Sequence, residues 1–85
     1  MGEMRVLLSE QIRGARALVG MRQRELATLA GVSVPTVRRI EGRPGVATGE
    51  DATVTAIRAV LEHAGIEFTF GEQPGVRLKR EKARR

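Results

Sequence analysis

The sequence predicts a small, mainly α-helical domain of about four helices that ends in a short β-hairpin. Three observations support this fold class. Apolar residues recur at helical spacing over most of the first 64 positions, and glycines stand where several of these segments stop. From residue 66 onward the apolar residues instead occupy every second position, which is typical of a strand. An 85-residue chain can build one core, so we expect a single domain over residues 1–78 and a basic tail over 79–85.

The first helix is predicted to follow Ser9 as its N-cap and to stop at Gly20. Ile12, Ala15 and Val19 recur at helical spacing within it. A second amphipathic segment, from about 22 to 30, stops at Gly31, which suits a left-handed C-cap.

A third helix is predicted from Ser33 as N-cap, with Pro35 in the first turn, where a missing N–H costs little. After the loop 42–45, Thr48 and Asp51 resemble a capping box for a fourth helix that Gly65 ends. Its apolar stripe consists of Val54, Ile57, Val60 and Leu61.

The hairpin is predicted over residues 66–78. Ile66, Phe68 and Phe70 alternate with polar residues, the segment 71–75 reads as a turn, and two further apolar residues flank Arg77. A two-stranded ribbon is marginal alone and has open edges, so we expect it to form the interface of a homodimer. The expected interface residues are Ile66, Phe68, Phe70, Val76 and Leu78. The alternative is that both phenylalanines cover the core of one chain.

The charge of the chain favours a polyanion as its partner. The formal net charge is +5 and the isoelectric point is near 11.3. Residues 21–43 hold five arginines against two glutamates, a net charge of +3, and residues 77–85 hold six basic residues against one glutamate, a net charge of +5. The longest aliphatic run near the N-terminus covers only residues 6–8, so no membrane association is expected. The absence of cysteine suits a reducing cytoplasm.

The most specific pattern lies between residues 23 and 42, where two short helices meet through a glycine. Such a helix-turn-helix requires apolar or small residues where the helices cross, and a glycine for positive φ at the turn. All the required types are present, at Leu26, Ala27, Ala30, Gly31, Val32, Val37 and Ile40.

Over this stretch the sequence resembles the xenobiotic-response-element (XRE) family, which includes the phage repressors and Cro proteins. The resemblance is carried by Gln23-Arg24-Glu25-Leu26-Ala27, Ala30-Gly31-Val32-Ser33 and Thr36-Val37-Arg38-Arg39-Ile40-Glu41. It implies a lambda-repressor-like fold and a transcriptional regulator, most often a repressor, that binds double-stranded DNA as a homodimer. Small members of the family often serve phages and other mobile elements. The chain departs from the family pattern at Arg22, where a Ser or Thr cap is usual, and in its C-terminal hairpin.

Helix geometry identifies the side chains that face away from the core. With Val37 and Ile40 turned inward, Pro35, Arg38 and Arg39 fall on the opposite face at about 100° per residue. Arginine can bind a guanine edge through two hydrogen bonds, and an apolar side chain can contact a thymine methyl. The resemblance further assigns Arg39 to base reading and Gln23 to a phosphate. The expected DNA-binding residues are Gln23, Arg24, Ser33, Val34, Pro35, Thr36, Arg38, Arg39 and Arg43. The alternative for Arg38 and Arg39 is an ion pair with Glu25 or Glu41.

Other classes of function find less support. One histidine, no cysteine and scattered acids assemble no catalytic or metal site, so we expect neither an enzyme nor a cofactor. An antitoxin-like module that binds a toxin or another regulatory protein and autoregulates its operon is the second interpretation. A small RNA-binding protein that uses the hairpin aromatics is the third.

Overall fold

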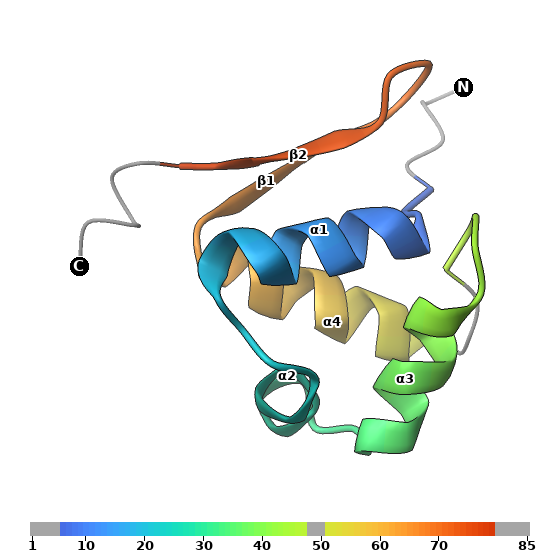
Figure 1. The fold of residues 1–85 in the computed structure, drawn as a ribbon, viewed down its shortest axis with the longest axis vertical. Helices are drawn as coiled ribbons and strands as arrows, with labels where there is room; N and C mark the ends of the chain where they lie inside the picture. The colour runs from blue at the N-terminus through green and yellow to red at the C-terminus, as the bar shows by residue number, and fades with distance from the viewer. Residues whose placement is uncertain (1–5, 48–50, 80–85) are drawn as a thin grey trace.

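The computed structural model describes residues 6–47 and 51–79. It confirms a mainly helical fold of four helices followed by a two-stranded antiparallel hairpin. The elements are α1 Ser9–Val19, α2 Gln23–Ala30, α3 Val34–Gly42, α4 Asp51–His63, β1 Ile66–Thr69 and β2 Gly75–Leu78. In Figure 1, α1 and α4 form the middle layer, the hairpin crosses one end of the molecule, and α2 and α3 lie at the other end.

The C-terminal ends of α1 and α2 follow the local signals in the sequence. Gly20 and Gly31 end α1 and α2 in the left-handed conformation, with φ values of 69° and 73°. Arg22 is the N-cap of α2 and makes no side-chain cap. The predicted capping box at Thr48 lies outside the described residues.

The prediction that Ser9 caps the first helix was wrong. Ser9 is the first residue of α1, Leu8 is its N-cap, and Gln11 Oε1 accepts the Leu8 N–H at 2.9 Å. The Ser9 hydroxyl is buried and donates to the Ile40 carbonyl oxygen at 2.7 Å. A tertiary hydrogen bond to α3 therefore takes the place of the local cap.

The core lies between the helices and beneath the hairpin. Its largest fully buried apolar side chains are Ile12, Leu26, Val37, Ile40, Ile57, Leu61 and Ile66. Gln11 is the polar link to the hairpin, because its Nε2 donates to the carbonyl oxygens of Thr69 at 2.8 Å and Gly75 at 3.0 Å. These two bonds fix the hairpin on α1.

The hairpin pairs Ile66 with Leu78 and Phe68 with Val76. Phe70 lies just beyond β1, so the strand is one residue shorter than expected. Ile66 and Phe68 are 1% and 7% exposed and belong to the core of the single chain. Of the side chains expected at a subunit interface, only Phe70, Val76 and Leu78 remain partly exposed.

Candidate nucleic-acid interface

The turn between α2 and α3 has the geometry that the sequence predicts. The Gly31 N–H donates to the Thr28 oxygen at 3.2 Å, and the Val32 N–H donates to the Ala27 oxygen at 3.0 Å. Both bonds satisfy carbonyls at the end of α2. The positive φ of Gly31 turns the chain directly into Ser33, the N-cap of α3.

The apolar residues of the motif form the small core that holds α2 against α3. Leu26, Ala27, Val37 and Ile40 are at most 2% exposed. Ala30 and Val32 pack against them and are partly buried. These contacts fix the crossing angle of the two helices, so the outward face of α3 has a defined orientation.

The outward face of α3 carries the side chains predicted to contact DNA. Pro35, Arg38 and Arg39 are exposed, whereas Val34 and Thr36 are half-buried. Within the described part of the chain, neither Arg38 nor Arg39 makes an ion pair. Their guanidinium groups are therefore available to a ligand.

The other predicted residues lie around this face. Ser33 is exposed, and its Oγ accepts the Thr36 N–H at 3.2 Å. Arg24 on α2 and Arg43 at the end of α3 are exposed. Gln23 opens α2 and is half-buried, with its Nε2 donating to Glu41 Oε1 at 3.1 Å.

A buried carboxylate joins the first three helices. Glu41 is 2% exposed and accepts two hydrogen bonds from Arg16, from Nε at 2.6 Å and from Nη2 at 2.8 Å. Arg16 Nη1 also donates to the Met21 carbonyl oxygen at 3.0 Å. The backbone carbonyl of Glu41 accepts from Arg13 Nη1. We refer to Arg16, Gln23 and Glu41 as the clamp.

The clamp was missed in the sequence, where Glu41 reads as a surface charge. Arg13 and Arg16 lie three residues apart on α1, a weak signal for a shared partner. The clamp also changes the charge of the surface. Because Glu41 is buried with Arg16, the exposed charges within residues 21–43 are five arginines against Glu25, a net charge of 5 − 1 = +4. The five are Arg22, Arg24, Arg38, Arg39 and Arg43.

The pKa of one carboxylate outside the motif, that of Glu10, is shifted from its usual value. Glu10 accepts the Gly45 N–H through Oε1 at 3.2 Å and Oε2 at 3.3 Å. Its own backbone N–H and that of Gly45 stabilise the charged form, with a smaller contribution from Arg13, and lower the pKa of Glu10 below its usual 4.5. Across residues 6–47 and 51–79, no group of three or more His, Cys, Asp or Glu is arranged to hold a metal ion.

Comparison with protein families identifies the motif. Residues 12–42, from the first turn of α1 to the end of α3, match a family model described as helix-turn-helix. This segment is a helix-turn-helix domain of the XRE type, and the four helices with their hairpin are consistent with a lambda-repressor-like fold. The family consists of DNA-binding regulators and not of enzymes, so the domain implies DNA binding.

Two further findings concern the chain as a whole. The search of curated proteins gave no match. None of the helices described here is long and apolar enough to cross a membrane.

Proposed function

We propose that this chain is a sequence-specific regulator of transcription, a repressor that binds a palindromic operator as a homodimer with α3 in the major groove. The observation that carries the proposal is the exposure of Arg38 and Arg39, without ion-pair partners among the described residues, on a helix that the apolar core and the clamp hold against α1 and α2. An arginine that is free and pre-positioned can bind both acceptors of a guanine edge.

The surface around α3 supports binding to a duplex. Its five exposed arginines would neutralise phosphates on either side of the groove. Gln23 suits a phosphate contact, because the first amides of α2 favour an anion and the clamp restricts the amide of its side chain. The proposed contacts are Gln23, Arg24, Ser33, Val34, Pro35, Thr36, Arg38, Arg39 and Arg43.

We propose a homodimer because a single recognition helix reads too few base pairs to define an operator. A single recognition helix contacts only a few base pairs, whereas two copies about 34–36 Å apart read two half-sites one helical turn apart. The hairpin suits the interface because it lies at the opposite end of the molecule from α3 (Figure 1). A transcriptional regulator binds chromosomal DNA, so we propose that this protein is cytoplasmic.

The test begins with selection of bound fragments from a random duplex library. On the selected site, Arg39→Ala should lose roughly 1–3 kcal/mol of binding free energy and relax the base preference at one position in each half-site. Arg24→Ala is the matched control on α2, and it should weaken selected and random duplexes alike.

Two results would contradict the proposal. Equal losses for Arg39→Ala on selected and random duplexes would make Arg39 a phosphate contact. A library in which no duplex is enriched would reject sequence-specific recognition altogether.

A further inference from the structure

The outer edge of β1 is a strand edge that residues 6–47 and 51–79 leave open. The Lys79 N–H donates to the Gly65 oxygen at 2.7 Å, in the same register as the four strand pairs. Hydrogen-bonded and non-hydrogen-bonded pairs alternate in an antiparallel ladder, so the N–H and C=O of Phe68 point away from β2. Among the residues the structure describes, no hydrogen bond uses these two groups.

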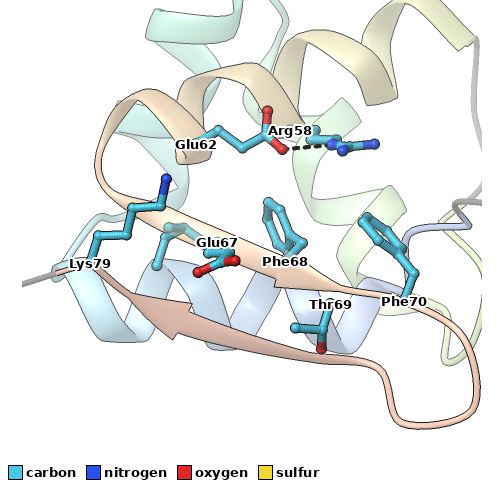
Figure 2. A pocket seen from close by; sticks show the side chains of 8 residues that line it. Arg58, Glu62, Glu67, Phe68, Thr69, Phe70 and Lys79 are labelled. Carbon is cyan, nitrogen blue, oxygen red and sulfur yellow. Dashed lines mark hydrogen bonds and ion pairs between the residues drawn. The ribbon is translucent and has the colours of Figure 1, made fainter.

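This edge forms one side of a groove of about 480 Å³ between β1 and α4. Figure 2 shows Arg58 and Glu62 of α4 along the other side and the rings of Phe68 and Phe70 turned toward α4. The Arg58 guanidinium lies 4.9 Å from the centroid of the Phe70 ring. The groove therefore offers an open backbone edge beside the partly exposed ring of Phe70.

The charges around the groove favour a protein strand over a nucleic acid. The groove is lined by Arg58 and Lys79 against Glu62 and Glu67, so it has no excess of positive charge to attract a polyanion. Arg58 pairs with Glu62 at 2.9 Å, and Glu67 pairs with Arg77 at 3.0 Å. Both pairs are substantially exposed, and exposed pairs contribute little to stability. A partner surface that also carries both positive and negative side chains can replace these two ion pairs with ion pairs of its own.

The outer edge of β2 is less suited to pairing. Pro74 directly precedes β2 and has no N–H to donate, which interrupts a ladder on that side. Of the two edges, β1 is the better suited to extend the sheet.

We propose that a second copy of this chain adds its β1 antiparallel to this edge, with Phe68 facing Phe68 of the partner subunit. In this register Glu67 lies opposite Thr69 of the partner subunit. A two-fold axis through Glu67 would instead place two carboxylates directly opposite each other, which is destabilising. The proposal rests on the homodimer of the proposed function and names the edge and register that form it.

The position of the hairpin makes this pairing compatible with operator binding. The molecule measures 36 × 29 × 20 Å, and the hairpin crosses one end of the longest dimension while α2 and α3 lie at the other (Figure 1). A two-fold axis normal to the extended sheet keeps the helices of both subunits on one face of the sheet. Both copies of α3 then point toward the same side, as one duplex requires.

The register is tested by disulfide formation between two variants, because the natural chain has no cysteine. Cβ atoms of residues directly opposite in a non-hydrogen-bonded pair lie within reach of a disulfide. A mixture of Glu67→Cys and Thr69→Cys chains, oxidised with and without the selected operator, should give the mixed disulfide as its main covalent product. Each variant alone should give far less dimer. Arg77→Cys is the control for the β2 edge and should stay uncrosslinked.

The outcomes separate this inference from the proposed function. Both cysteine variants must select the same operator under reducing conditions, which verifies that they fold. A chain that sediments as a dimer and selects an operator, but forms no mixed disulfide, would overturn the β1 pairing and leave the regulator intact. A dominant Arg77→Cys disulfide would assign the interface to β2. A chain that stays monomeric even on its operator would overturn the pairing together with the homodimer.

Discussion

At the scale of single residues, the clamp holds a buried carboxylate between the first three helices. Glu41 is 2% exposed and Arg16 is 19% exposed, so the carboxylate depends on its partner. Removing one member of a buried pair leaves an uncompensated charge in the interior.

We therefore expect Arg16→Met to lower the free energy of unfolding by about 3–5 kcal/mol in urea denaturation. The double variant Arg16→Met, Glu41→Met should recover much of this stability, because no buried charge remains. Arg58→Met is the matched control, since it breaks an exposed pair with Glu62 worth at most about 1 kcal/mol. If Arg16→Met and Arg58→Met lowered the free energy of unfolding equally, the buried pair of the clamp would stabilise the fold no more than an exposed ion pair does.

Glu10 gives the chain a predictable response to acid. Its pKa is lowered below 4.5 in the folded chain, so its contribution to stability is present above its unfolded pKa and is lost as the pH falls through the folded value. Glu10→Gln removes the charge, so the natural chain should be more stable than the variant at neutral pH. The difference should narrow as the pH falls below 4.5. Unfolding curves with an equal difference near neutrality and at about pH 3 would contradict this assignment.

At the scale of elements, α3 depends on Ser33 at its N-terminus. The hydroxyl accepts the Thr36 N–H, and removal of such a cap typically costs about 1 kcal/mol. Ser33→Ala should therefore lower stability by about this amount in thermal or urea unfolding.

Ser33→Asp separates the role of the cap from a role in DNA binding. Aspartate caps a helix as well as serine does, so stability should be kept, while its negative charge beside a phosphate should weaken binding to any duplex. Wild-type affinity for Ser33→Asp would place Ser33 away from the DNA.

The helix ends show which elements could be read from the sequence. Gly20, Gly31 and Ser33 act within one turn of the chain, and all three serve as predicted. Ser9 has the same local signal as Ser33, yet its hydroxyl binds the Ile40 carbonyl 31 residues away. Propensity alone does not distinguish the two serines, because the difference depends on whether α3 lies beside the hydroxyl.

At the scale of the whole molecule, we expect the basic tail to increase the salt dependence of DNA binding, because residues 80–85 carry four basic side chains against one glutamate. Deletion of residues 80–85 keeps Lys79, whose N–H donates to Gly65, and so leaves the hairpin intact. If the tail binds phosphates, the plot of log affinity against log salt should become shallower by about 0.9 for each phosphate that the shortened chain no longer neutralises. Site preference should not change.

A matched control keeps the length of the tail and replaces Arg80, Lys82, Arg84 and Arg85 with glutamine. It should flatten the salt dependence as the deletion does. An unchanged slope in both variants would show that the tail does not bind the duplex.

The sequence by itself determined the four helices, the hairpin and the helix-turn-helix with its small core. These features are encoded by residues within a few positions of one another, such as the spacing of Leu26 and Ala27 from Gly31. Periodicity of this kind is the primary signal of secondary structure in a sequence. The outward placement of Arg38 and Arg39 follows from the same periodicity, once Val37 and Ile40 face inward.

Only the tertiary structure decided which polar residues are buried and which hairpin side chains belong to the core. Glu41 meets Arg16 across 25 positions of sequence, and Gln11 reaches the Thr69 carbonyl across 58. Phe68 is buried and Phe70 is partly exposed, although the two occupy equivalent places in the alternating pattern. Each of these outcomes depends on how one element docks on another, and a side chain finds its partner only after the helices and the hairpin have packed.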